Sequence, residues 1–231
     1  MNCKFTNLTE SEIEIYLLPF IPKNKRGFPS KISTAYIMRC ILYKLKIGCQ
    51  WNALFITGIG FQPLCSWQLV YYYFKKWSKQ EVFKDMFMTL LCLQKNKLNT
   101  ETINLDGTHS LSKRDGECVG YQHRKKGKTS NVLILTDGNG IPIAIGDILS
   151  GNHNDLYKVV PQLSKMIANL NQVGICIENS ALNADKGFDS KHLRRYCHQK
   201  KIIPNIKENV RSRKQTKRGR KRQFFEKVYK Q

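Results

Sequence analysis

Two aspartates in similar settings are the residues of this sequence best placed to do chemistry. Asp106 lies in ETINLDGTHS and Asp185 in NSALNADKGFDS, each directly after a short apolar run with the character of a buried strand. A carboxylate at the end of such a strand is costly unless a cation holds it. In a chain of net charge +22, the two carboxylates predict a divalent-metal site that acts on phosphate. The alternative is that each Asp only caps the turn that follows, which is a common role for this residue.

The excess of basic residues indicates a polyanionic partner. The 231 residues include 39 Lys and Arg against 17 Asp and Glu, which favours nucleic acid, although a ribosomal or membrane-surface protein would share this composition. The basic residues concentrate from Arg211 to Arg222, in RSRKQTKRGRKR. Such a run is usually solvated, and it attracts nucleic acid with an affinity that falls as the salt concentration rises.

Cysteine usage and hydropathy suggest the compartment. The eight cysteines form no CxxC pair, which argues against a zinc ribbon, and most lie among apolar residues like the core thiols of a reducing compartment. The N-terminal stretch turns acidic too early for a signal peptide, and no apolar stretch approaches the roughly 18 residues of a membrane span. We therefore expect a cytoplasmic protein without a membrane partner.

Residues 1–93 have the pattern of a small helical domain, and the polar stretch 94–101 is typical of a linker. Thr9 with Glu12, and Ser78 with Glu81, match the capping box that begins a helix. The many aromatic residues are expected to form the core of this bundle, and a helix–turn–helix with residues 71–76 near DNA is the alternative. Caps, breakers and apolar periodicity predict helices over residues 9–18, 33–47, 66–77 and 78–93.

From residue 102 the pattern changes to strands. The sequence Asp137-Gly138-Asn139-Gly140 is a strong hairpin signal. Asn154 or Asp155 is expected to cap the first helix of this region and Asp189 the second. Strands are predicted over residues 102–105, 132–135, 141–145, 175–184 and 201–206, with Pro204 marking the last as an edge strand, and helices over 155–170, 190–199 and from 223 onward.

This order predicts an α/β fold, with a mixed sheet covered by helices on both faces. Asp106 and Asp185 would then end the first and fourth strands. A right-handed crossover between parallel strands brings such ends together, which favours the paired-carboxylate interpretation over two independent turn caps.

Several segments resemble, in order, the DDE transposases of bacterial insertion sequences. They are LDGTHS, GYQHRKKGKTSNVLILTDGNGIPIAIGDILSGNHNDL and NADKGFDS. The likeness is to the insertion-sequence-five group within the insertion-sequence-four-like set, and ILYKLKIGCQW and YYYFKKWSKQEVF are similar to that group's helical DNA-binding region. The resemblance covers nearly the whole chain. It implies a DNA-binding domain over residues 1–93, a ribonuclease-H-like catalytic domain over residues 102–231, and association with the nucleoid when bound to DNA.

The resemblance also implies catalytic residues. Asp106 would be the first acid of a triad and Asp185 the second, and together they would hold two Mg²⁺ ions, with Mn²⁺ able to replace them. The family carries a third acid, a Glu, in the pattern Tyr-x-x-Arg-x-x-x-Glu. Here Tyr229 is followed only by Lys230 and Gln231. We therefore expect a C-terminally truncated transposase, impaired or inactive in DNA cleavage and strand transfer.

The expected partner is double-stranded DNA, at transposon ends and at the target, with a homodimer on DNA as one arrangement. His153 and Asp155 match a family segment near the site, although they could equally be loop and cap residues. The alternative functions are a non-catalytic, sequence-specific DNA-binding protein or regulator derived from a transposase, and a different metal nuclease of the same fold. The residues expected to bind DNA are Lys186, Arg124, Lys125, Lys126, Lys128, Arg211, Arg213, Lys214, Lys217, Arg218, Arg220, Lys221 and Arg222.

Overall fold

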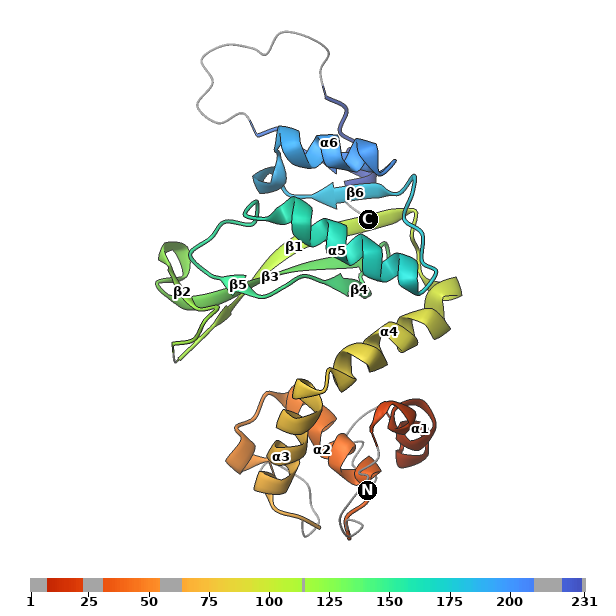
Figure 1. The fold of residues 1–231 in the computed structure, drawn as a ribbon. Helices are drawn as coiled ribbons and strands as arrows, with labels where there is room; N and C mark the ends of the chain where they lie inside the picture. Colours follow the sequence, from red (N-terminus) through yellow and green to blue (C-terminus); the bar gives the residue numbers. More distant parts are fainter. Residues whose placement is uncertain (1–7, 23–30, 55–63, 114, 210–221, 230–231) are drawn as a thin grey trace. The chain divides into compact units, whose positions relative to one another are not determined.

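The computed structural model describes residues 8–22, 31–54, 64–113, 115–209 and 222–229. The chain divides into two compact units, Met1–Leu90 and Leu91–Gln231 (Figure 1). Within the described residues, none of the helices has the length and apolar character needed to cross a membrane.

The first unit is helical. Its core is built around fully buried Ile13, Ile37, Ile41 and Trp77, and half-buried aromatic side chains pack against them. The prediction that aromatic residues help to form this core is confirmed. Its helices are α1 (Glu10–Tyr16), α2 (Thr34–Ile47), α3 (Trp67–Lys79) and α4 (Val82–Gln94), with short 3₁₀ turns η1 (Leu18–Phe20) and η2 (Trp51–Ala53); α4 continues into the second unit.

The caps of α1 and α2 are confirmed. Thr9 and Glu12 form the capping box of α1, and the Ser33 side chain accepts a hydrogen bond from a backbone N–H of α2. Gly48 ends α2 in the left-handed conformation, at φ 68°, which glycine adopts without a steric cost.

The capping box predicted for α4 is wrong. Ser78 lies inside α3, and its Oγ donates to the carbonyl oxygen of Phe74 at 2.7 Å. The hydroxyl is therefore committed to the preceding turn of its own helix, as serine side chains often are. Glu81 has a φ of 55° and precedes α4, so a two-residue break at Gln80 and Glu81 separates α3 from α4.

The second unit contains a mixed seven-stranded sheet. The strand order is β2-β3-β1-β6-β7, with β4 and β5 also paired to β3. Pairs among β1 to β5 are antiparallel, whereas β1–β6 and β6–β7 are parallel. The predicted α/β class is confirmed, and this order is the ribonuclease-H-like arrangement. The strands are β1 (Thr102–Leu111), β2 (Gly120–Gln122), β3 (Gly127–Asp137), β4 (Pro142–Ile145), β5 (Leu149–Ser150), β6 (Ala181–Ala184) and β7 (Ile203–Ile206); η3 (Lys95–Lys97), η4 (His123–Lys125) and η5 (Lys186–Phe188) are 3₁₀ turns.

Helices lie on both faces of this sheet, as predicted. One face presents buried apolar residues such as Leu105, Leu182 and Ile206, and α5 (Val159–Gln172) runs across the sheet on one side, in contact with α6 (Lys191–Gln199) (Figure 1). The other face carries polar side chains of β1, β6 and β7, and those of β6 and β7 hydrogen-bond the region of α7 (Glu226–Tyr229). The two faces thus have different chemistry.

Several predicted strands have other lengths, among them β3, which covers Gly127–Asp137 and not only residues 132–135. β1 does not end at Asp106 but continues to Leu111, paired with β3 throughout. Its outer half is polar and largely exposed, so it gives no apolar signal. β6 is shorter than residues 175–184, because only Ala181–Ala184 pairs with β1. Ile175 and Ile177 are buried without being in a strand.

The start of α5 was also predicted wrongly, whereas the hairpin and the edge strand are confirmed. α5 begins at Val159, and its N-cap position is Lys158, with no side-chain cap from Asn154 or Asp155. The carboxylate of Asp137 closes the turn between β3 and β4 by accepting the N–H groups of residues 139 and 141. β7 lies at the edge of the sheet, as Pro204 predicts.

Candidate metal and DNA site

Asp106 and Asp185 lie side by side on the sheet. In the parallel pair of β1 and β6, Leu105 is opposite Ala184, and each aspartate is the next residue along its strand direction. Asp106 is in the middle of β1, whereas Asp185 follows β6 and retains an extended backbone. Both are exposed. Because side chains alternate between the faces of a strand, both carboxylates emerge on the polar face.

Each carboxylate is oriented by a nearby backbone amide. Asp106 Oδ1 accepts the N–H of Gly107 at 2.8 Å, and Asp185 Oδ1 accepts the N–H of Gly187 at 2.6 Å. A Cβ on residue 187 would lie 2.7 Å from that same oxygen, so glycine permits the close turn. Neither carboxylate forms an ion pair with a residue that the structure describes, although both residues are exposed.

This donor set fits a hard divalent cation. Mg²⁺ is usually held by one or two carboxylates, with water and phosphate oxygens as its other ligands. No group of three His, Cys, Asp or Glu residues able to hold a metal is found within the described ranges. A metal held by the two aspartates would therefore need its other ligands from water or phosphate.

Asp155 belongs to a different cluster. Its Oδ1 accepts the Asn131 side-chain amide at 2.9 Å and lies 3.7 Å from Nε2 of His109. It also occupies the space that a side chain on Gly107 would need. Gly107 and His109 alternate with Asp106 along β1, so Asp155 lies on the opposite face. Asp155 thus anchors its loop to the sheet, and His153 stacks on Tyr157 in the same loop, with ring centroids 3.7 Å apart.

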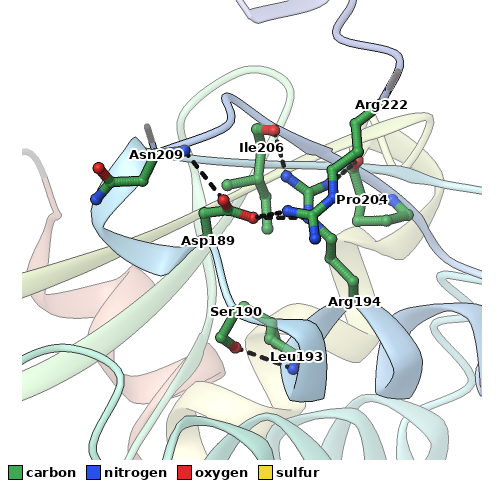
Figure 2. A network of polar contacts seen from close by, with 8 residues as sticks. All are labelled: Asp189, Ser190, Leu193, Arg194, Pro204, Ile206, Asn209 and Arg222. Carbon is green, nitrogen blue, oxygen red and sulfur yellow. Dashed lines mark hydrogen bonds and ion pairs between the residues drawn. The ribbon is translucent and has the colours of Figure 1, made fainter. Parts of the chain in front are cut away.

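Asp189 is a buried anchor for the segments that follow β7, not the cap predicted for α6. Figure 2 shows its carboxylate between Arg194, Arg222 and the backbone of Asn209. Oδ1 accepts from Arg194 Nε at 2.9 Å and Arg222 Nη1 at 2.5 Å, and Oδ2 accepts from Asn209 N–H at 3.0 Å. The cap of α6 is instead Ser190, whose Oγ accepts from the N–H of Leu193.

The charge of Asp189 is stabilised in this position. Its side chain is only 4% exposed, and burial by itself would raise its pKa. The hydrogen bond from Asn209 and the charges of Arg194 and Arg222 outweigh this effect, so the pKa of Asp189 is lowered. Arg194 also donates to the carbonyl oxygen of Ile206 at 2.6 Å, which ties the network to β7.

Three asparagines form a hydrogen-bonded row across the polar face. Asn104 is opposite Asn183, and Asn183 is opposite Asn205, in the parallel register of β1, β6 and β7. Asn183 Nδ2 donates to Asn104 Oδ1 at 3.0 Å, and Asn205 Nδ2 donates to Asn183 Oδ1 at 2.7 Å. Asn104 Nδ2 donates to the carbonyl oxygen of Asp137 at 3.1 Å. Asn183 and Asn205 are 4% and 0% exposed, so the row is internal.

The same row binds the backbone of residues 222–229, which we call the docked segment. Asn205 accepts the N–H of Phe225 at 2.7 Å and donates to its carbonyl oxygen at 3.1 Å, and Asn183 donates to the carbonyl oxygen of Val228 at 2.9 Å. Sequence reasoning missed this row. The signal that could have revealed it is a repeated Asn-x-Asp, at Asn104-Leu105-Asp106 and Asn183-Ala184-Asp185.

The residues predicted to bind DNA differ in exposure and in their contacts. Arg124, Lys125 and Lys126 are exposed around η4, next to edge strand β2, and exposed Lys128 pairs with Asp115 at 2.6 Å. Lys186 is exposed in η5, directly after Asp185. Arg222 is engaged by Asp189. Arg211, Arg213, Lys214, Lys217, Arg218, Arg220 and Lys221 lie outside the described residues.

Part of the first unit matches a known family model. Residues 12–87 match a family model described as "Putative transposase of IS4/5 family (DUF4096)". This part of the chain is therefore similar to IS4/5 transposases. The resemblance to insertion-sequence transposases is thereby confirmed. No curated protein matches the sequence significantly.

Two solved structures match this chain in a structural comparison. One is titled "Mos1 transposase paired-end complex with left transposon end", with 10% identity and a TM-score of 0.33. The other is "Crystal structure of a pre-cleavage Mos1 transpososome", with 12% identity and a TM-score of 0.34. Each match covers 80% of this chain and 61% of the Mos1 chain.

Proposed function

We propose that this chain is a DDE-type transposase protein that binds the DNA ends of an insertion element and holds divalent cations at Asp106 and Asp185 for strand cleavage and transfer. The observation that carries the proposal is the parallel register of β1 and β6, which sets two exposed carboxylates on adjacent strands. The family match of residues 12–87 supports the transposase assignment. The roles of the individual residues are part of the proposal.

In this proposal the aspartates bind the cations, and backbone N–H groups orient the aspartate side chains. The N–H groups of Gly107 and Gly187 each hold one carboxylate oxygen, so the other oxygens face the metal and phosphate. When bound, the cations would activate a water or a DNA 3′-hydroxyl and stabilise the leaving oxygen. Lys186, exposed beside Asp185, would contact a DNA phosphate through its ammonium group.

The DNA surface is proposed to include three regions. These are the helical first unit, the exposed basic residues around η4 and the basic run that ends at Arg222. The chain's large positive charge favours such contacts. We propose that a homodimer binds a palindromic or paired-end DNA. Sedimentation of the complex, which gives the number of protein copies on the DNA, tests this.

The second candidate is a DNA-binding protein without catalysis. It is favoured by one observation, that the described residues place no third carboxylate beside Asp106 and Asp185. In that case DNA binding would be independent of the two aspartates, and cleavage would be absent. The predicted truncation stays a prediction, and sequencing of the DNA downstream of codon 231 tests it.

Mn²⁺ binding separates the two candidates. Titration of the full chain, followed by the electron paramagnetic resonance signal of free Mn²⁺, should show binding that weakens by at least about tenfold in Asp106→Asn and in Asp185→Asn, because each change removes a ligand. The same variants should lose any Mn²⁺-dependent nicking of supercoiled plasmid. Their affinity for duplex DNA without metal should be unchanged or slightly higher, since each loses a negative charge.

Asp147→Asn is the matched control, because Asp147 is an exposed aspartate of the same unit that pairs with Lys165. It should bind Mn²⁺ like the wild type. Equal Mn²⁺ affinity in the wild type and in the double variant of Asp106 and Asp185 would refute the proposed metal site. Nicking that persists in the double variant would place the catalytic centre elsewhere.

A further inference from the structure

We infer that Asn183 and Asn205 are positioning residues, which hold the docked segment (residues 222–229) against the polar face so that α7 runs toward the candidate metal site. This inference rests on the proposed function of Asp106 and Asp185. It concerns residues that contact backbone, not metal or DNA. Their role would be to fix the direction in which the polypeptide approaches the two carboxylates.

The spacing of the contacts defines the direction of α7. Asn205 holds Phe225 and Asn183 holds Val228, and these two asparagines are opposite each other on neighbouring strands. Neighbouring strands lie about 4.8 Å apart. Three helical residues rise about 4.5 Å. The two lengths agree, so the segment crosses the strands nearly at right angles, from β7 to β6. The strand that follows in this direction is β1, which carries Asp106.

The asparagine side chains are suited to bind backbone. A carboxamide has a donor and an acceptor, and Asn205 uses both on the same residue, Phe225. If the segment were undocked, the Oδ1 of Asn205 would lose the only donor that the described structure gives it. The row is therefore complete only when the docked segment is in place.

A second anchor holds the beginning of the docked segment. Arg222 pairs with buried Asp189, which is four residues after Asp185 in the sequence. The segment is thus held at residues 222, 225 and 228, by Asp189, Asn205 and Asn183 in turn. All three partners lie on β6, β7 or the turn that contains Asp185. Anchors at intervals of three residues leave little freedom for the direction of α7.

Paramagnetic broadening by Mn²⁺ tests this inference on the full chain. In the wild type, Mn²⁺ but not Mg²⁺ should broaden the backbone amide signals of Asp106 and Asp185, and also those of Val228 and Tyr229. In Asn205→Ala, the signals of the two aspartates should still be broadened, whereas those of residues 228–229 should lose the broadening. Asn171→Ala, which changes an exposed asparagine of α5, should behave like the wild type.

A second variant avoids any change in the buried row. Phe225→Pro removes the N–H that donates to Asn205, at a residue that is 48% exposed. Phe225→Leu keeps the N–H and is its control. Loss of the broadening of residues 228–229 in Phe225→Pro but not in Phe225→Leu supports the inference.

The possible failures are distinct. If residues 228–229 stay broadened in both Asn205→Ala and Phe225→Pro, or are not broadened in the wild type while Asp106 and Asp185 are, the positioning role is overturned and the metal site stands. If Mn²⁺ broadens neither aspartate in the wild type, the metal site itself is overturned, and the positioning role toward it falls with it.

Discussion

Replacement of Asp189 by Asn should lower the free energy of unfolding of the second unit. The substitution keeps the size of the side chain and removes its charge. Arg194 and Arg222 then face a neutral amide in a place where the native side chain is only 4% exposed. Loss of one partner of a buried ion pair costs about 3–5 kcal/mol in other proteins.

The structure lowers this estimate for Asp189. Arg222 is 27% exposed, so water partly compensates its charge, and Arg194 retains the carbonyl oxygen of Ile206 as an acceptor. We therefore expect the free energy of unfolding to fall by about 2–3 kcal/mol. At roughly 1.4 kcal/mol for each factor of ten, the slowest amides of β6 and β7 should exchange with solvent about 30- to 150-fold faster.

Native-state hydrogen exchange of β6 and β7 measures this change directly. Asp147→Asn is again the control, because its ion pair with Lys165 is exposed, at 58% and 59%, and such pairs contribute about 0–1 kcal/mol. If exchange in Asp189→Asn were as slow as in Asp147→Asn, the buried carboxylate would not be holding these segments together, and the reasoning from burial would be wrong.

Three further predictions follow from buried groups. The pKa of Asp189 is lowered in the folded state. Its contribution to stability should therefore be complete above pH about 4, the usual pKa of unfolded Asp, and be lost as the pH falls through the lowered value. In acid unfolding, the stabilities of the wild type and Asp189→Asn should therefore converge at low pH. Burial raises the pKa of the Cys197 thiol to about 12, so iodoacetamide at pH 8 should label exposed Cys92 and spare Cys197, as peptide mass spectrometry would show. Gly151→Ala should lower the stability by about 1–3 kcal/mol in urea unfolding, because its methyl group would overlap the backbone of β3, whereas Gly116→Ala meets only one side chain at 3.5 Å and should be neutral.

The sequence predicted most of the fold because its local signals are strong. Thr9 with Glu12 and Ser33 begin α1 and α2 through side-chain contacts within three residues, which depend little on the rest of the chain. The same signal failed at Ser78, where the hydroxyl had a second partner in the preceding turn. Strand lengths were harder to predict, since the outer half of β1 pairs with β3 and needs no apolar side chains.

The two aspartates of the candidate site could be predicted from the sequence. The buried residues that hold the surrounding segments, Asp189 and the asparagine row, could not. Asp106 and Asp185 each follow a short apolar run, and this local pattern marks the strand that carries or precedes each aspartate. Asp189, by contrast, matches a helix cap, and one of its partners, Arg222, is 33 residues away in sequence. Contacts over such a separation depend on the position of β7 and on the return of the chain across it, which no local pattern specifies.

The repeated Asn-x-Asp of β1 and β6 links the asparagine row to the two candidate metal ligands. In an extended strand, residues two apart lie on the same face and about 6.6–6.8 Å apart along it. Each strand therefore places an asparagine, which takes part in the row under the docked segment, one repeat before an aspartate that faces solvent. Because Asn104 is opposite Asn183, a slip of either strand by one residue would disrupt the asparagine row and separate the carboxylates together. The buried row thus specifies the register on which the proposed metal site depends, and this gives a physical reason for placing amides in an interior where apolar side chains could pack.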